Sequence, residues 1–371
     1  MAAKTDLASP NISKLTQRLD NIFRKYEQKR IGMPKGQQAA LQGRICSARS
    51  GLDYRFPDTS RPYHIASIGK LFTMTLIGML VDQGKLTWHD RISSYFKQEE
   101  LERLFLYKGR DYAGDVTISH LLGHTSGIGD YFEGPVNSGR SFADSILSEP
   151  NRIWTPSELI AFTRERQQAV SPPGSRFQYS DTGFILLGQL IEKVTGSTFG
   201  SLLRTRIFEP LNMRDTYLMF YTEPLNVPAP AISPLWFKKH DISGFNSLSC
   251  DWSGGGIVST TDDLLVFSQA LHGGRLYDPS TLQTVTSFPH QFRPGIHYGL
   301  GMMEIQFERL FFLLRGYPRL RGHLGITAAH LHCDPASDTH IVLNFGSDAA
   351  MHQSFNALIA IMSELKKAQV L

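Results

Sequence analysis

The sequence has few of the features that hold small secreted proteins together or carry a chain across a membrane. It contains three cysteines, Cys46, Cys250 and Cys333, and an odd number without paired spacing does not indicate a disulfide framework. No apolar stretch is long enough to span a bilayer, and the opening residues MAAKTDLASPNISK contain no apolar segment typical of a secretory signal. We therefore expect reduced thiols in a cytoplasmic protein without a membrane span.

Strong charge of one sign is also missing. The formal net charge is +4 over 371 residues, and the basic residues are spread along the chain. This pattern gives no support for a nucleic-acid partner. The chain is 41% hydrophobic and 19% charged, which is typical of a globular protein, and its length suits two lobes around a cleft.

Motifs for metals and phosphates are incomplete. Two short groups superficially suggest zinc: His120 with His124, and His330 with His332 and Cys333. Neither supplies a ligand set of the right spacing. The run 254–256 is three glycines without the lysine of a phosphate-binding loop. We expect no metal and no cofactor, and we interpret the glycines as a place of close packing beside a cleft.

Periodic patterns predict helices and strands along most of the chain. Helical spacing is found at 12–26, 67–83, 185–194, 262–271 and 351–366. Strand-like runs are found at 38–48, 52–56, 298–305, 309–314, 323–333 and 340–345. Between them, residues 222–253 contain four prolines and predict a long ordered loop.

This order of elements predicts an α/β (α+β) fold. Strands near both ends imply an antiparallel sheet flanked by the N- and C-terminal helices, with a mostly helical lobe inserted between its two parts. We place the sheet lobe at residues 1–62 and 252–371 and the helical lobe at residues 63–251.

A serine and a lysine three residues apart are the strongest candidates for chemistry. Ser67 and Lys70 fall on one face at the start of a predicted helix. A serine hydroxyl is a weak nucleophile that a neighbouring amine can activate. The following residues, LFTMTLIGML, are apolar nearly all round, so the helix should be buried. Lys70 is then not an ordinary surface lysine.

Longer segments around this pair resemble a known family. In chain order they are IASIGKLFTMTLIGMLVDQGKL, ISHLLGHTSGIGDY, PPGSRFQYSDTGFILLGQLIEKVTG, GGGIVSTTDDLLVFSQALHGGRL, YGLGM and GHLG. They resemble the family of class C β-lactamases, D-alanyl-D-alanine carboxypeptidases, D-aminopeptidases and related serine esterases, from about residue 60 to residue 346. The resemblance implies a β-lactamase/transpeptidase-like fold and a serine hydrolase that forms an acyl-enzyme on Ser67.

The second motif departs from the family pattern. Tyr179-Ser180-Asp181 lies where the family usually has Tyr-x-Asn. A rival register would set Ser180-Asp181-Thr182 against the Ser-Asp-Asn box of class A enzymes, but the flanking residues favour Tyr179. The resemblance implies that the Tyr179 phenol relays a proton from Ser67 to the leaving group. An ionised aspartate only accepts hydrogen bonds. If Asp181 faces Lys70, it should keep that amine protonated. Tyr179 then becomes the better base, with Lys70 lowering its pKa.

The third motif, His323-Leu324-Gly325, stands where β-lactamases have Lys-Thr-Gly and resembles the family's His-x-Gly form. We expect Gly325 to let the strand approach the substrate. The resemblance assigns the oxyanion hole to the backbone N–H groups of Ser67 and Ile326. A neutral His323 removes a fixed positive charge. Strand alternation puts arginines 319 and 321 on the same face as His323, and Arg321 is our candidate to restore that charge for a substrate carboxylate.

Two further groups of residues are candidates for catalysis or substrate binding. Glu209 opens a Glu-Pro-Leu-Asn run that imitates the deacylating loop of class A β-lactamases, but its surroundings match an ordinary connection of the family, so we assign it no catalytic role. Three aromatic residues of the proline-rich loop either line an apolar acyl site or anchor the loop: Tyr221, Trp236 and Phe237.

The sequence thus predicts a serine hydrolase for small esters, amides or peptides, of esterase, D-aminopeptidase or carboxypeptidase type. We expect β-lactam hydrolysis to be weak, because the third-motif lysine and the second-motif asparagine are both replaced. The alternative is a non-catalytic homologue that keeps the fold as a binding or scaffold protein. The oligomeric state is not predicted.

Overall fold

The computed structural model describes residues 12–29, 41–57 and 60–371, and an eight-stranded sheet runs through it. Its strands, in spatial order, are β10 (His290–Arg293), β11 (Ile296–Tyr298), β12 (Met303–Ile305), β13 (Leu320–Gly325), β14 (Ala329–Asp334), β15 (Thr339–Asn344), β1 (Gln42–Ser47) and β2 (Leu52–Phe56). Strand β1 pairs antiparallel with β15. The two ends of the chain therefore build one antiparallel sheet, as the order of elements predicted.

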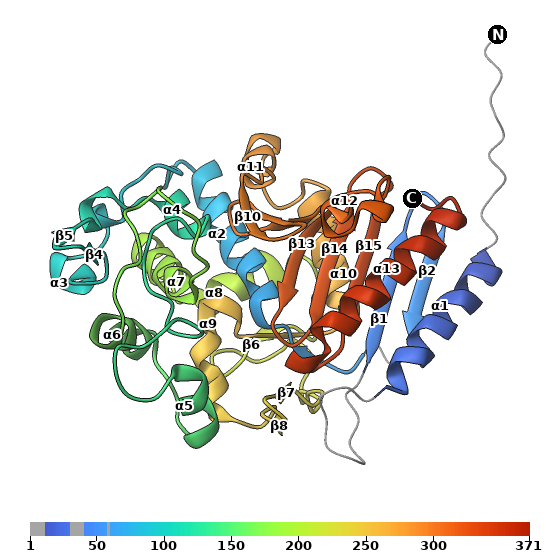
Figure 1. The fold of residues 1–371 in the computed structure, drawn as a ribbon, viewed down its shortest axis with the longest axis horizontal. Helices are drawn as coiled ribbons and strands as arrows, with labels where there is room; N and C mark the ends of the chain where they lie inside the picture. Colours follow the sequence, from blue (N-terminus) through green and yellow to red (C-terminus); the bar gives the residue numbers. More distant parts are fainter. Residues whose placement is uncertain (1–11, 30–40, 58–59) are drawn as a thin grey trace, which may run out of the picture.

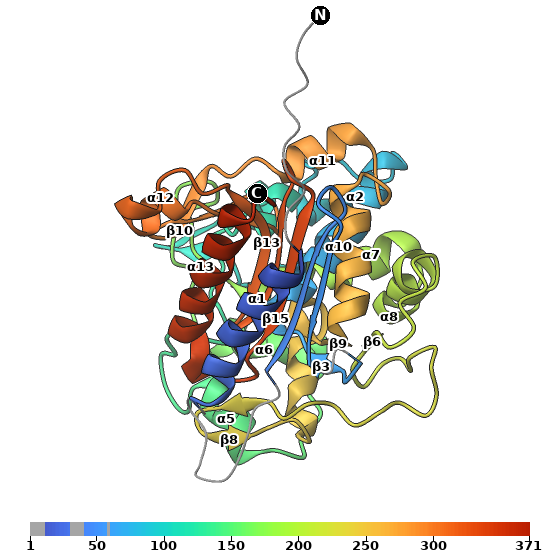
Figure 2. The same ribbon diagram turned by 90° about the vertical axis from the view of Figure 1, so that its right-hand side faces the viewer.

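Helices cover both faces of the sheet (Figures 1 and 2). On one face lie α1 (Ile12–Glu27) and α13 (Met351–Lys367), which pack against each other, and α10 (Thr261–His272) lies on the other. Strand β2 alternates buried and exposed residues, as expected of a strand with one solvated face. Helix α1 buries Leu15, Leu19 and Phe23, which recur every four residues. Its amphipathic pattern is thus used for packing on the sheet.

The inserted part of the chain is mostly helical (Figure 1). Its main helices are α2 (Lys70–Asp82), α4 (Ile118–Leu122), α5 (Phe142–Ser148), α6 (Pro156–Arg166), α7 (Asp181–Thr195), α8 (Phe199–Leu203) and α9 (Trp252–Gly255). Helices α2 and α7 are buried on nearly all sides. Helix α7 ends at Gly196, whose φ of +68° is left-handed, as a glycine just past a helix end predicts.

Several local predictions needed correction. Residues 309–314 are not a strand: they form the end of α12 (Phe307–Leu310) and a 3-10 turn, η6 (Phe312–Leu314). The runs 298–305 and 323–333 are each divided between two strands by a turn. The predicted loop 222–253 contains a small hairpin of β7 (Trp236–Phe237) and β8 (His240–Asp241) and a 3-10 turn, η5 (Asn246–Asp251).

Part of the first predicted strand, residues 38–40, lies outside the described residues. The division into lobes at residues 62–63 and 251–252 stays a prediction. Within the described ranges, none of the helices is both long enough and apolar enough to cross a membrane.

Two glycines of α7 provide a test of how tightly the helical part is packed. A Cβ added at Gly188 would lie 2.4 Å from Ser253 Oγ and 2.7 Å from the Trp252 ring, whereas at Gly183 the nearest atom would be 3.6 Å away. We expect Gly188→Ala to lower the free energy of unfolding by about 1 to 3 kcal/mol through overpacking. Gly183→Ala should cause no loss and a gain of up to about 1 kcal/mol from helix propensity. Urea denaturation of both variants measures the difference, and equal stabilities would contradict the packing described.

Candidate active site

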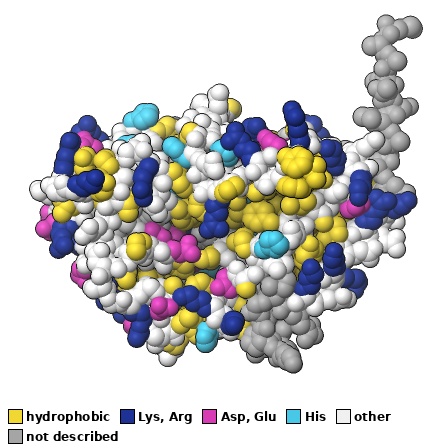
Figure 3. Space-filling view, in the orientation of Figure 1, with side chains coloured by type: hydrophobic (Ala, Val, Ile, Leu, Met, Phe, Trp, Pro, Cys, Tyr) yellow, Lys and Arg dark blue, Asp and Glu magenta, His cyan; other side chains and the backbone are white. Residues whose placement is uncertain are grey.

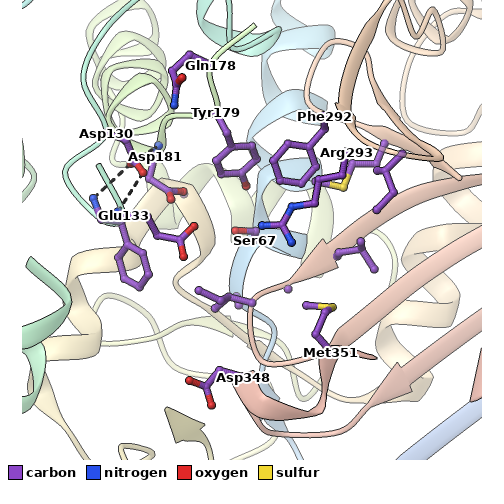
Figure 4. Close-up of a pocket in the computed structure, with 18 of the residues that line it drawn as sticks. Ser67, Asp130, Glu133, Gln178, Tyr179, Asp181, Phe292, Arg293, Asp348 and Met351 are labelled. Atoms are coloured by element: carbon purple, nitrogen blue, oxygen red, sulfur yellow. Dashed lines mark hydrogen bonds between the residues drawn. The ribbon is translucent and has the colours of Figure 1, made fainter. Parts of the chain in front are cut away.

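A cavity of about 810 Å³ contains the predicted nucleophile (Figure 4). It receives residues from η1 (Ala66–Gly69), the start of α7, β10 and the end of β13. Its lining includes Ser67, Tyr179, Asp181, Gly325 and Ile326. Five of the eight site residues predicted from the sequence thus line one cavity, although they lie up to 259 positions apart in the chain.

Ser67 lies on a short 3-10 turn rather than on the α-helix itself, which begins at Lys70. Ala66, just before it, has a left-handed φ of 49°. Glycines make room for this turn: a Cβ at Gly255 would lie 2.8 Å from the carbonyl carbon of Ala66, and one at Gly325 would lie 2.8 Å from Ile65 O. The glycines of 254–256 therefore serve close packing beside the cleft, as predicted. Gly325 lets the end of β13 approach the backbone of Ile65, two residues before the nucleophile. Its approach to a substrate stays a prediction.

Lys70 is fully buried and its Nζ is surrounded by acceptors. It donates to Ser67 Oγ at 3.0 Å, to the backbone oxygen of Gly254 at 2.7 Å and to the Asp181 carboxylate. An ammonium has three N–H donors and no acceptor. The three contacts use all three donors and leave no lone pair on the nitrogen, so the geometry suits a protonated amine. The predicted contact between Asp181 and Lys70 is therefore present.

Asp181 belongs to a group of carboxylates on one side of Ser67 (Figure 4). It is the first residue of α7, and its backbone N–H donates to Asp130 Oδ1 at 2.9 Å. Burial, reinforced by the charge of Asp181, raises the pKa of Asp130 to about 7 and that of Asp251 to about 7. Both residues line the cavity, and so does Glu133. At neutral pH this side of the cavity carries partial negative charge that varies with pH.

Tyr179 lines the cavity beside the nucleophile, and the Ser67 side chain is among the groups that act on the pKa of its phenol. Lys70 Nζ is 5.1 Å from the centroid of its ring. Burial, and then the charge of Asp181, raise the pKa of the phenol well above 10, while the hydrogen bond to Ser67 opposes them. The expected lowering of the pKa of Tyr179 is thus not found: its pKa is raised overall, chiefly by burial. The phenol is neutral in the resting protein.

His124 holds the tyrosine segment in place, a role that the sequence did not reveal. Its ring lies 4.1 Å from the Tyr179 ring, centroid to centroid, and its Nδ1 accepts from the backbone N–H of Ser180 at 3.1 Å. Burial lowers its pKa well below 6.5, so it is neutral. Within the described residues, no group of three metal-ligating side chains is close enough to bind a metal ion.

His323 lies behind the cavity rather than in its lining. It is fully buried, and its Nε2 lies 3.1 Å from the phenol oxygen of Tyr298. Burial and the neighbouring Lys70 lower its pKa to about 3, which agrees with the expected neutral ring. Tyr298 connects His323 to the site, since its ring packs edge-on against Tyr179 with centroids 6.0 Å apart.

Arg321 is not placed to bind a substrate in the cavity. Its Nε lies 3.7 Å from Glu304 Oε2 on the neighbouring strand, and Arg319 contacts the same carboxylate at 3.6 Å. Neither arginine lines the cavity. The cation that does so is Arg293, at the end of β10. Figure 4 shows its guanidinium on the side of Ser67 opposite Asp181 and Glu133.

The other candidates lie away from the cavity. Glu209 forms an exposed ion pair with Arg204 at 2.8 Å. Trp236 and Phe237 are buried in the hairpin of the proline-rich loop, and neither they nor Tyr221 line the cavity. The loop-anchor interpretation therefore holds for Trp236 and Phe237, whereas Tyr221 is 43% exposed. Apolar lining comes instead from the sheet side: Phe292, Ile296, Met303, Leu310, Leu324, Met351 and Phe355.

Comparison with known proteins gives matches along most of the chain. The family model described as Beta-lactamase matches residues 46–361. A curated relative from Salmonella paratyphi B, named "Putative D-alanyl-D-alanine carboxypeptidase", is 26% identical over 314 residues, which cover 77% of this chain and 69% of the relative.

Solved structures agree with this match. A D-stereospecific amidohydrolase from a Streptomyces species superimposes with a TM-score of 0.73 and 26% identity, covering 94% of this chain and 98% of that one. A D-amino acid amidase from Ochrobactrum anthropi SV3 superimposes with a TM-score of 0.77 and 21% identity, covering 96% and 99%. The second likeness shows the fold alone. Together the matches point to a hydrolase with the fold of penicillin-binding proteins.

Exchanging Asp181 for asparagine tests the protonation state of Lys70. Our hypothesis is that the Asp181 carboxylate holds the Lys70 amine as an ammonium, and it predicts that kcat/KM of the parent for a p-nitrophenyl ester changes little across neutral pH. In Asp181→Asn the amine is free to lose its proton and act as a base. We expect kcat/KM of this variant to rise with pH across the same range. Stopped-flow acylation rates at several pH values measure the effect.

A surface carboxylate supplies the control for this exchange. Asp144 makes an exposed ion pair with Lys238, so Asp144→Asn should leave the pH profile of acylation as in the parent. Superimposable profiles for the parent and Asp181→Asn would count against the assigned role of Asp181.

Proposed function

Because this chain belongs to the Beta-lactamase family, we propose that it is a serine amidohydrolase that cleaves small amides or esters of amino acids carrying a free amino group. The observation that carries the proposal is the position of Ser67. Its hydroxyl accepts a hydrogen bond from Lys70 at 3.0 Å and lies with Tyr179 in a cavity lined by carboxylates and by apolar residues.

Acylation begins with attack of Ser67 Oγ on the substrate carbonyl carbon. As that C–O bond forms, the Ser67 proton passes to the Tyr179 oxygen, and the phenol passes its own proton to the leaving nitrogen or oxygen. The phenol remains neutral throughout, which suits a tyrosine whose pKa is raised. The bond to the leaving group then breaks. Lys70, as an ammonium, orients Ser67 and stabilises negative charge that develops at its oxygen.

When Ser67 attacks, negative charge develops on the carbonyl oxygen of the substrate, and hydrogen-bond donors are needed to stabilise it. Ser67 and Ile326 both line the cavity, and we propose that their backbone N–H groups form the oxyanion hole. Losing one donor of such a pair costs about 10² to 10³ in turnover.

Deacylation reverses the relay with water. A water oxygen attacks the acyl carbon, its proton passes to Tyr179, and the phenol returns a proton to Ser67 Oγ. The acid product then leaves, and the resting state of all three side chains is restored. No metal or cofactor enters these steps.

The charges of the cavity support a substrate with a free amine. Asp130, Glu133 and Asp251 line it on the side of Asp181, where an ammonium group would be attracted. The apolar residues from the sheet offer space for the amino-acid side chain. Arg293, on the opposite side, is the candidate partner for a carboxylate on the leaving group when the substrate is a peptide. The name of the D-stereospecific amidohydrolase, which is 26% identical to this chain, supports D-amino-acid derivatives as the substrates.

The pKa values of the carboxylates give the proposal a test. Asp130 and Asp251, with pKa values raised to about 7, are largely protonated at pH 6 and largely ionised at pH 8. Attraction for an ammonium therefore grows as the pH rises. We expect the ratio of KM for D-phenylalanine amide in Asp251→Asn to that in the parent to rise severalfold between pH 6 and pH 8. Because the variant and the parent meet the same substrate, titration of the substrate amine cancels in the comparison.

A neutral substrate and the opposite enantiomer complete this experiment. KM for p-nitrophenyl acetate should have nearly the same pH dependence in the parent and in Asp251→Asn. The L-amide reports the stereochemical preference. Turnover of the ester together with no turnover of either amide would refute the amidohydrolase assignment while retaining an esterase.

A further inference from the structure

Three consecutive large apolar residues project from the molecule next to the cavity. Phe311, Phe312 and Leu313, here called the apolar tip, have exposed fractions of 52%, 71% and 66%. They are among the most exposed large apolar side chains of the described chain. Single exposed apolar residues are common on soluble surfaces, but a contiguous group indicates an interaction site.

The apolar tip is held in place by its neighbours. Leu310, Leu314 and Tyr317 pack against the core that α1 and α13 form with the sheet. Lys366 of α13 donates to the backbone oxygen of Gly316 at 2.9 Å. The inward residues thus recur at helical spacing and leave the apolar tip on the outside. In Figure 2 the α12 segment projects at the edge of the molecule, beyond α13.

Basic residues flank the apolar tip in the sequence. Between residues 307 and 319 the chain has three arginines, at 309, 315 and 319, and one acid, Glu308. Arg319 is paired with Glu304 and Glu308, so Arg309 and Arg315 are the arginines left to attract an anionic surface. Lys366 adds a further cation beside Gly316. Figure 3 shows apolar side chains with lysine and arginine next to them in the region where Figure 1 places α12.

We propose that the apolar tip and its basic surroundings dock this protein on an anionic lipid surface. Aromatic and leucine side chains insert at the boundary between headgroups and acyl chains, while arginine and lysine attract anionic lipid, in the way that interfacial segments bind. A second copy of the chain suits this surface less well. A twofold contact through the apolar tip would bring the two sets of basic residues together.

Docking would bring the cavity close to the membrane. Leu310, directly before the apolar tip, lines the cavity. A bilayer bound at the apolar tip therefore lies near the cavity mouth. This inference does not depend on the amidohydrolase assignment, since it rests on a surface outside the catalytic groups.

Co-sedimentation of the full chain with vesicles tests the proposal. We expect binding to vesicles in which a third of the lipid is phosphatidylglycerol, weaker binding to pure phosphatidylcholine, and loss of the difference at high salt. Joint replacement Phe312→Ser and Leu313→Ser should weaken binding about tenfold or more. Arg315→Gln should weaken binding to the anionic vesicles about fivefold and leave binding to neutral vesicles unchanged.

Val227 offers a matched control, because it is also 71% exposed but lies in the proline-rich loop. Val227→Ser should bind vesicles like the parent, and every variant should hydrolyse a small water-soluble ester at the parent rate. Absence of vesicle binding by the parent, or binding that the tip variants do not change, overturns the proposal. Self-association in the ultracentrifuge that the tip variants abolish also overturns it, since the surface would then join two copies.

Discussion

The ammonium of Lys70 joins three separate parts of the chain at one point. Its three hydrogen bonds reach Ser67 on the preceding turn, Asp181 at the start of α7 and the backbone of Gly254 in α9. A charge without solvent exposure is costly unless it is paired and hydrogen-bonded. The surrounding elements must therefore approach closely, and the glycines allow it. A Cβ at Gly69 would lie 2.9 Å from the Cα of Gly255.

The same carboxylate that satisfies Lys70 shapes the charge of the whole cavity. Asp181 is a cause of the raised pKa values of Asp130, Asp251 and Tyr179. An asparagine at this position would supply hydrogen bonds without the negative charge that raises these pKa values. The departure from the usual motif thus has two linked consequences. We propose that it favours a neutral tyrosine relay over a lysine base, and the charge of Asp181 adds to burial in raising the pKa values of Asp130 and Asp251 to about 7.

Features that depend on local spacing could be predicted from the sequence. Ser67 and Lys70 are three residues apart on one turn, and the register of the second motif places Tyr179 and Asp181 next to them. The antiparallel sheet followed from strands at both ends of the chain. Each of these conclusions needs only a repeating pattern or a short motif.

Features that depend on distant packing were missed. Arg321 was expected at the substrate, but the pairing of β12 with β13 places it opposite Glu304, and no local pattern fixes that register. Arg293, Glu133 and Asp251 reach the cavity from segments whose positions come from tertiary contacts. At 309–314, apolar content suggested a strand, whereas the spacing of Leu310, Leu314 and Tyr317 already matched a helical turn.

Covalent labelling tests the central claim, that Ser67 is the nucleophile of a working acyl-transfer site. The folded protein is treated with a fluorophosphonate, and separately with a penicillin, and the adduct is located by peptide mass spectrometry. The account predicts a single adduct on Ser67 with at least the fluorophosphonate, and none in Ser67→Ala. Absence of labelling by both reagents in a folded sample would contradict it and favour a non-catalytic homologue with the same fold.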